Sequence, residues 1–551
     1  MPPHGASLRR GIAKSFALCA AGLALLSLSA CNPPESPEGI QMKPGVQVLK
    51  RGNGAEPVTL DPHRAVSVPA MNILRDLFEG LVATAADGTS IPGAAARWET
   101  SIDGLQWRFE LRRDARWSNG ERVTAADFVA GLRRALDPAT GSATAGLLAP
   151  ILNARAIMTG RLPPDQLGVE APDEYTVVVK LAAATPWLPE LLSHPVSAPL
   201  YRPGYEKHGD DFAVPGRMVS NGPFHLSEWQ PGQFVKLSAN HNYPRRQDIA
   251  IDAVIYYPIE NQDIELERFE AGELHWTADV PHHRLGWLER RRADELVITP
   301  RMAITWLGFN VTRPPFEAAP GLRRALAMAV DRDLIVRAVT GAGEMQAYGW
   351  VPPMDGYELQ VPDWAELPRN EQVEQARGLY AAAGFSAEAP LELELLYPAG
   401  LNNRRLAIAV AAMWRDAFGV RTRLREEPFV EFLESRADTG TTMVFRSGWA
   451  ADYADPYSFL GLFDSETGAS DTGWRNVAYD ELLQASLQAL NPRRRLTLLA
   501  EAERLLLEDQ PVVPLYFDVR RRLVRPEVRG WKPNPMDLHP SRHFYLAVAE
   551  Q

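Results

Sequence analysis

The segment that decides the fold is Phe445-Arg446-Ser447-Gly448-Trp449-Ala450-Ala451-Asp452-Tyr453-Ala454-Asp455-Pro456-Tyr457-Ser458-Phe459, which follows the β-prone run 441–445. Gly448 permits close approach by another backbone, and one cation and one carboxylate flank a short run of mostly small residues. Such a segment is suited to bind an extended zwitterion, for example a short peptide. The alternative is a strand end followed by a turn at Asp455-Pro456, with the aromatic side chains in the core.

The same segment resembles a known ligand-contacting motif. The run 448–453, with Asp455-Pro456 and Ser458-Phe459 after it, resembles the corresponding stretch of periplasmic oligopeptide-binding proteins. These form the peptide-binding cluster of the ABC transporter solute-binding protein family 5.

Further motifs carry the same resemblance along the chain. Their order and spacing make the match specific, and it runs from about residue 46 to about residue 549. The motifs are Leu60-Asp61-Pro62, Asp76-Leu77-Phe78-Glu79-Gly80-Leu81, Asp87-Gly88, Trp117-Ser118-Asn119-Gly120-Glu121 with Asp127-Phe128, and Ala347-Tyr348-Gly349-Trp350-Val351-Pro352-Pro353.

Length and composition restrict the class of protein. A chain of 551 residues is too long for one ordinary core, so we expect two or three domains. Hydrophobic residues make up 46% and charged residues 23%, as in a globular protein. The net charge of -11 argues against nucleic acid as a partner.

Residues 1–30 are typical of an export signal. A basic region precedes the apolar run 16–28, which is too short and too rich in alanine for a membrane span. The run ends in Leu28-Ser29-Ala30-Cys31, which looks like a bacterial lipobox, a motif in which Cys31 becomes the lipidated N-terminus. The alternative is an ordinary signal peptide cleaved near Ala30.

Cysteine usage agrees with lipidation. The chain has two cysteines, and Cys19 lies inside the predicted signal, so the mature chain would carry only Cys31 and no intramolecular disulfide. Residues 31–45 are rich in Pro, Glu and Gly and are predicted to form a flexible tether.

Hydrophobic periodicity predicts an α/β protein. The expected helices are 71–81 with Gly80 as its C-cap, one capped at its start by Thr124, 261–271, 320–330, 371–383 and 404–418. The expected strands are 107–111, 175–181, 225–229, 234–237, 254–257, 305–309, 391–397 and 420–426.

The resemblance implies the arrangement of these elements. It is that of a periplasmic-binding-protein-like, two-lobed (Venus flytrap) α/β fold with an extra third domain. Its implied boundaries are 46–78, 202–302 and 520–551 for a discontinuous lobe I, 79–201 for lobe II, the extra domain, and 303–519 for lobe III.

The resemblance also assigns roles to residues. Asp452 would pair with the α-amino group of a peptide, and Arg446 and Arg436 would meet its carboxylate. The residues implied to contact the peptide backbone or line the cleft are Val68, Ser447, Gly448, Trp449, Ala450, Ala451, Tyr453, Phe429 and Asn403. The alternatives are a surface or capping role for Asp452, a structural ion pair for Arg446 and core packing for Phe429.

Two positions depart from the family pattern. Val66 stands where well-known members have an acidic residue, and Thr144 stands where they have an aromatic one. Both positions help to hold the first residue of the ligand, so Asp452 would be the only clear amine anchor. The preferred peptide length and first side chain therefore stay open.

No catalytic pattern is present. The chain lacks G-x-x-x-x-G-K-[ST], H-E-x-x-H and G-x-S-x-G. His282-His283 is the one histidine pair, and adjacent side chains point apart, so a shared metal is not expected. We therefore expect no enzyme, no cofactor and no metal.

The function expected from the resemblance is extracytoplasmic capture of short peptides and their delivery to an ABC importer. The protein would be a monomer in the periplasm or cell envelope, anchored to a membrane through Cys31, and Asn32 after it weakly favours an outer membrane. Three alternatives remain. They are the same scaffold with murein peptide or another small ligand, a chaperone or signalling receptor that uses the same cleft, and a lipoprotein peptidase.

Overall fold

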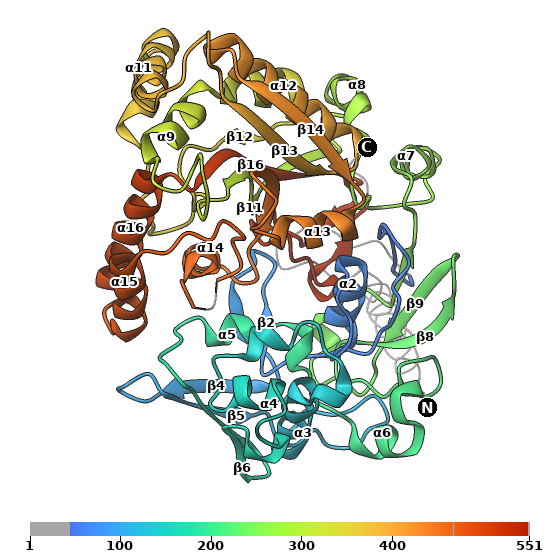
Figure 1. The fold of residues 1–551 in the computed structure, drawn as a ribbon. Helices are drawn as coiled ribbons and strands as arrows, with labels where there is room; N and C mark the ends of the chain where they lie inside the picture. Colours follow the sequence, from blue (N-terminus) through green and yellow to red (C-terminus); the bar gives the residue numbers. More distant parts are fainter. Residues whose placement is uncertain (1–44, 467, 549–551) are drawn as a thin grey trace, which may run out of the picture.

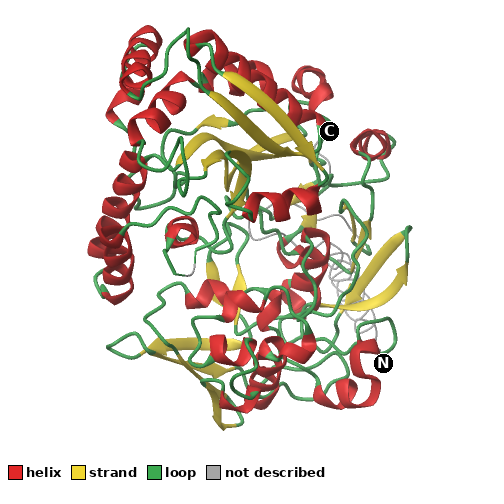
Figure 2. Cartoon of the chain, viewed as in Figure 1, coloured by secondary structure: helices red, strands yellow, loops and turns green. Residues whose placement is uncertain are grey.

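The computed structural model describes residues 45–466 and 468–548. The predicted signal, Cys31 and nearly all of the predicted tether lie outside these residues. In Figures 1 and 2 the chain forms a lower and an upper body, both built of mixed helices and sheets. No helix in the described part of the chain is long and apolar enough to span a bilayer.

The lower body contains two four-stranded sheets that share one hydrophobic core. Leu49, Leu237 and Val254 of the first sheet and Phe109 and Val177 of the second belong to the same buried cluster. The first sheet has the order β1 (Val48–Gly52), β10 (Ala253–Tyr257), β9 (Phe234–Ala239) and β8 (Phe224–Gln230). The second has the order β4 (Ala95–Thr100), β5 (Gln106–Leu111), β7 (Thr176–Lys180) and β6 (Val169–Asp173).

Seven helices and two short β-ribbons accompany these sheets in the described chain, and Figure 1 shows the last two of these helices beside the upper body. The helices are α2 (Val68–Leu77), α3 (Ala125–Leu136), α4 (Ala154–Met158), α5 (Leu188–Leu191), α6 (Arg202–His208), α7 (Gln262–Glu270) and α8 (Leu285–Arg291). The ribbons are β2 (Val82–Thr84) with β3 (Ser90–Pro92), and β17 (Val528–Arg529) with β18 (Tyr545–Leu546).

The upper body is built on a six-stranded sheet. Successive side chains on a strand point to opposite faces, so Val444 packs into one core and Phe445 into another. The order is β12 (Met345–Gln346), β16 (Val512–Leu523), β11 (Leu296–Phe309), β15 (Val444–Ala450), β13 (Glu392–Pro398) and β14 (Arg421–Glu427). Its helices are α9 (Pro320–Ala329), α10 (Arg332–Leu334), α11 (Arg369–Ala382), α12 (Leu401–Phe418), α13 (Phe429–Ala437), α14 (Tyr457–Leu460), α15 (Val477–Gln488) and α16 (Pro492–Asp509).

Two predicted elements need correction. The helix expected at 71–81 is α2, which starts three residues earlier because Ser67 caps it, and Gly80 is not its C-cap. It ends at Leu77, whose carbonyl accepts a hydrogen bond from the amide of Gly222, while Phe78 is already extended. The strand expected at 305–309 is only the end of β11, which begins at Leu296.

The long antiparallel pair β11 and β16 joins the two bodies. The register is regular for 296–300 against 519–523 and resumes at Ile304 opposite Phe517. The extra residues 301–303 form a bulge, which bends a strand and increases its local twist. This bulge lies beside β15, because the carbonyl of Met302 accepts a hydrogen bond from the amide of Ala451.

Candidate functional site

Strand β15 offers an unpaired backbone edge. Along one side it pairs with β11 over its whole length, from Val444 to Ala450. Along the other side β13 pairs only with Val444 and Phe445. Within the described residues, the edge from Arg446 to Ala450 therefore has no strand partner. Such an edge can add an extended peptide as a further strand.

Asp452 lies just beyond this edge, and its carboxylate has no partner among residues 45–466 and 468–548. Its backbone amide donates a hydrogen bond to Ser458 Oγ (3.1 Å), while no described residue bonds or ion-pairs with its side chain. The side chain of Asp452 is accessible to solvent. It lines a cavity of about 700 Å³, however, and the walls of this cavity displace much of the surrounding water. This desolvation raises the pKa of Asp452 to about 6. A cation brought into the cavity would favour the ionised form.

An aromatic clamp, formed by Trp187, Tyr453 and Tyr457, holds the loop that carries Asp452. Trp187 comes from the lower body and stacks on Tyr453, with ring centroids 5.3 Å apart, and on Tyr457, at 5.0 Å. The guanidinium of Arg495 lies 4.7 Å from the Trp187 ring and binds Asp455 through two hydrogen bonds of 2.6 and 2.8 Å. The clamp thus joins the two bodies beside Asp452.

The two predicted carboxylate-binding arginines differ in the partners that they have within the protein. Arg436 forms an ion pair with Asp471 (2.6 Å) and donates to Ser447 Oγ (2.9 Å), so the protein already neutralises its charge. Arg446 donates a long hydrogen bond to Thr305 Oγ1 (3.4 Å), and no described carboxylate lies within ion-pair distance of it. Arg446 is therefore the better placed of the two to accept a ligand carboxylate.

Arg446 also affects an acid on β16, the strand on the other side of β11. Burial raises the pKa of Asp518, and Arg446 and Arg301 oppose that rise without cancelling it. Arg446 therefore contributes a positive potential to this part of the sheet.

The other predicted site residues lie on several elements and differ in exposure. Val68, the first residue of α2, is 55% exposed, and Phe429, the first residue of α13, is 63% exposed, so Phe429 is not a core residue. Gly448 is exposed, and Trp449 is half-buried and donates from Nε1 to the carbonyl of Ser458 (2.8 Å). Asn403 lies in the first turn of α12 and donates to the carbonyl of Pro398 (3.0 Å), so its amide serves the local fold.

The two departures from the family pattern differ in exposure, because Val66 is exposed whereas Thr144 is half-buried. Val66 is 61% exposed. Thr144 lines the same cavity as Asp452, and its small side chain leaves room there. The first side chain of a ligand held by Asp452 would therefore meet a wide space.

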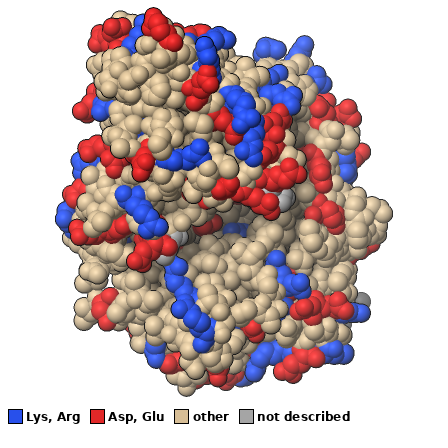
Figure 3. Space-filling model, in the orientation of Figure 1, with Lys and Arg blue, Asp and Glu red and all other residues tan. Residues whose placement is uncertain are grey.

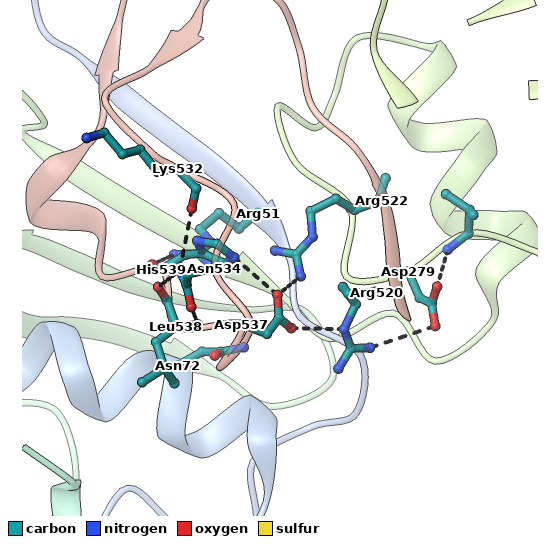
Figure 4. A network of polar contacts seen from close by, with 12 residues as sticks. Arg51, Asn72, Asp279, Arg520, Arg522, Lys532, Asn534, Asp537, Leu538 and His539 are labelled. Atoms are coloured by element: carbon teal, nitrogen blue, oxygen red, sulfur yellow. Dashed lines mark hydrogen bonds and ion pairs between the residues drawn. The ribbon is translucent and has the colours of Figure 1, made fainter. Parts of the chain in front are cut away.

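A polar network, drawn in Figure 4, fixes the lower end of β16. Asp537 accepts hydrogen bonds from Arg520 (2.9 Å) and Arg522, and it pairs with His539 (3.1 Å). Burial alone would raise the pKa of Asp537, but Arg522, His539 and Arg520 together hold it well below its usual value. The network adjoins a cavity of about 220 Å³ that is also lined by Val68.

Figure 3 shows the surface between the two bodies as a hollow, with acidic side chains along its upper lip and a basic group at its floor. No cluster of three or more metal-ligating side chains occurs in the described parts of the chain.

Three residues of this site were missed from the sequence. Trp187 and Arg495 are far from Tyr453 and Asp455 along the chain, and no spacing rule links them. Asp455 was noted only as part of a turn, which it also forms. A buried tryptophan before a short proline-containing helix carries no sequence signal of contact with another domain.

Comparisons with known proteins agree with this architecture. The family model for bacterial extracellular solute-binding proteins, family 5 (middle region), matches residues 89–471. The periplasmic oligopeptide-binding protein OppA of Salmonella typhimurium is 36% identical over 536 residues, which cover 96% of this chain and 98% of OppA.

Solved structures of relatives have the same fold. The unliganded open form of the periplasmic murein tripeptide-binding protein MppA matches with a TM-score of 0.82 and 32% identity, covering 93% of this chain and 99% of MppA. Haemophilus influenzae OppA in complex with the peptide RPPGFSPFR matches with a TM-score of 0.77 and 32% identity, covering 92% of this chain and all of that one. The chain therefore belongs to the bacterial extracellular solute-binding proteins of family 5 and has their two-lobed mixed α/β fold.

Proposed function

We propose that this chain captures short oligopeptides in the cleft between its two bodies and delivers them to an ABC importer. The observation that carries the proposal is Asp452, a desolvated carboxylate that no described residue binds, beside an unpaired strand edge. A peptide offers the complementary groups: an α-ammonium for Asp452 and backbone N–H and C=O groups for β15. Arg446 would bind the peptide carboxylate.

The proposed mechanism of capture is closure of the lobes. Lobe I would comprise 46–78, 202–302 and 520–551, lobe II 79–201, and lobe III 303–519. Because β11 and β16 run from lobe I into lobe III, the bulge at 301–303 is a suitable position for the hinge. The closed state would be favoured by contacts that the ligand makes to both sides at once.

Broad selectivity follows from the space around the ligand's first residue. The cavity of about 700 Å³ is larger than one side chain needs, so water can fill the unused volume. Main-chain groups and the two termini would then supply most of the affinity, and side chains would add little discrimination.

Murein peptide is a second candidate ligand on the same scaffold. The likeness to the murein tripeptide-binding protein MppA, at 32% identity over 93% of this chain, supports it. A murein peptide also carries a free α-amino group for Asp452. Competition between a linear tripeptide and a murein tripeptide for the purified protein would rank the two.

We further propose that the protein is a binding protein and not a peptidase. The site as described has charge-pairing groups but no activated nucleophile beside a base. Incubation of the protein with a peptide mixture, followed by mass spectrometry, tests both parts. Retention of intact peptides with free N-termini is expected, whereas turnover to fragments, or no retained peptide, would contradict the proposal.

The place of action is proposed to be the periplasm, as a monomer held on a membrane by lipid on Cys31. The support is the sequence Leu28-Ser29-Ala30-Cys31 and the tether after it. Each buried CH₂ of a lipid chain contributes about 0.8 kcal/mol, so Cys31→Ala should release the protein from membranes without unfolding it. Membrane fractionation measures this, and a Cys31→Ala protein that stays in the membrane fraction would refute the anchor.

A further inference from the structure

The cavity of about 700 Å³ that contains Asp452 has two walls of different character. The lower body supplies mostly small or apolar residues, and Arg155 is the one charged residue among those that line the cavity. From the upper body, the described lining residues include three acids, Asp452, Asp464 and Glu466, and no cation. Figure 3 agrees with this division, because acidic side chains lie along the upper lip of the hollow.

Glu466 contributes an unpaired carboxylate to the upper wall. Its side chain is exposed, and no residue in 45–466 or 468–548 bonds or ion-pairs with it. Its backbone amide donates a hydrogen bond to Asp464 Oδ1 (3.0 Å), so the two acids belong to one turn. The amide of Ser465 donates to Asp480 Oδ1 on α15 (3.1 Å), which fixes this turn on the upper body.

Arg155 opposes these acids but does not balance them. Burial raises the pKa of the Tyr457 hydroxyl to about 12, and Asp464 adds to this rise whereas Arg155 opposes it. Tyr457 therefore lies within electrostatic range of a charge on each wall. Once the α-ammonium of a ligand has neutralised Asp452, two acids remain in the lining against one arginine. The occupied cavity thus keeps an excess of one negative charge.

The first side chain of a peptide held by Asp452 enters the same cavity. The α-amino group and the first side chain leave the same carbon atom, so an ammonium on Asp452 places that side chain beside it. The rest of the peptide would follow the unpaired edge from Ala450 to Arg446 and so lead away from Asp452. The cavity is larger than any one side chain, so a long basic side chain fits in it.

We propose that this cavity favours a basic first side chain, lysine or arginine, and that Glu466 is the residue that determines the preference. The inference rests on the proposed peptide function and concerns charge alone, while selection by size and shape stays broad. A side-chain cation supplies the positive charge that the upper wall lacks, whereas a first side chain with a carboxylate meets charges of its own sign.

The test compares three tripeptides by calorimetry: Lys-Ala-Ala, Gln-Ala-Ala and Glu-Ala-Ala. In the wild-type protein we expect the lysine peptide to bind about fivefold more tightly than the glutamine peptide, the upper range for a partly exposed ion pair, and the glutamate peptide to bind most weakly. Glu466→Gln should reduce the ratio of lysine to glutamine to about one, because it removes the excess charge. Glu99→Gln is the matched control, since Glu99 is an exposed glutamate on β4 that lines neither cavity described above, and it should leave the ratio unchanged.

Arg155→Gln tests the charge balance from the other wall. It removes the one lining cation of the lower body, so it should increase the preference for lysine. An equal change for all three peptides would contradict the proposal.

Two measurements on the wild-type protein do not depend on any variant. The preference for lysine should shrink in 1 M salt, because salt screens a partly exposed pair. Moving the lysine to the second position, in Ala-Lys-Ala, should abolish the preference. Equal affinity for the three tripeptides, a lysine preference that survives Glu466→Gln, or the same preference at the second position would overturn the proposal. Failure of all three tripeptides to bind would instead refute peptide capture itself.

Discussion

Asp452 and Asp455 lie three positions apart on the loop after β15, and the protein treats them in opposite ways. Asp455 is held by two hydrogen bonds from Arg495, and the exposed fractions of the two side chains are only 13% and 6%. Asp452 has no such partner in the described part of the chain, and desolvation in the cavity raises its pKa to about 6. One carboxylate thus serves the clamp between the bodies, and the other is the one that we propose to bind a ligand.

The comparison shows why charge alone does not define a binding site. A buried ion pair whose groups satisfy each other belongs to the fold, whereas a desolvated group without a partner stores an unfavourable free energy that a ligand can relieve. The same contrast separates Arg436, paired with Asp471, from Arg446, which has no ion pair among the described residues.

The largest expected effect is on stability. Arg495→Met leaves Asp455 buried without its counter-charge, which should lower the free energy of unfolding by about 3–5 kcal/mol. Urea unfolding measures this. Asp452→Asn is the matched control and should cause no such loss, because its carboxylate has no protein partner. Equal destabilisation by both changes would remove the distinction between the two carboxylates.

The next effect concerns the two arginines. Arg446→Ala should weaken binding of a peptide with a free carboxylate by about 1.5–3 kcal/mol, the usual value of a hydrogen bond to a charged group. The loss should disappear for the C-terminally amidated peptide. Arg436→Ala should affect the melting temperature more than the affinity, because it breaks the pair with Asp471. Calorimetry and thermal unfolding check both, and a larger affinity loss for Arg436→Ala would reverse the assignment.

The smallest effect is a pH dependence of binding. Since the free protein has a pKa of about 6 at Asp452 and a bound ammonium favours the carboxylate, affinity should rise with pH through 6 and level off near 7. At pH 5 about one protein in ten is ionised there, so affinity should be about tenfold lower than at pH 7 and binding should release a proton. Asp452→Asn should abolish this dependence; an unchanged pH profile in that variant would assign the titration to another group.

The pKa of Asp452 has the opposite consequence for folding. Its value in the folded state is above the usual 3.8, so the folded protein binds this proton more tightly than the unfolded chain does. Its contribution to stability is therefore greatest below pH 4 and is lost as the pH rises through 6. Ligand affinity and stability should thus change in opposite directions over this interval.

Local pattern predicted the elements that are amphipathic and sharply bounded. The helix capped by Thr124 is α3, whose capping box includes Asp127, and the hairpin of β8 and β9 lies where alternation placed it. Strand β16 was not predicted, because its arginine-rich second half hides a strand that is buried against β11. The full length of β11 was not predicted either, because its first residues are half-exposed and lack clear alternation.

Motif resemblance predicted the family, now shown by the comparisons, and it singled out Asp452, whose role stays a prediction. It could not separate Arg446 from Arg436, since only the packing of Asp471 against Arg436 does so. Contacts such as Trp187 on Tyr453 depend on how the bodies meet, and residues so far apart in the chain leave no periodic trace.

The most direct test of the account is calorimetry on four combinations: wild type or Asp452→Ala, each with a free or an N-acetylated peptide. If Asp452 binds the α-ammonium, either change alone should cost about 2–5 kcal/mol, because it leaves the other charge without its partner. Both changes together should then cost little more than one of them. Full additivity, or wild-type affinity in Asp452→Ala, would contradict the account and place the amine elsewhere.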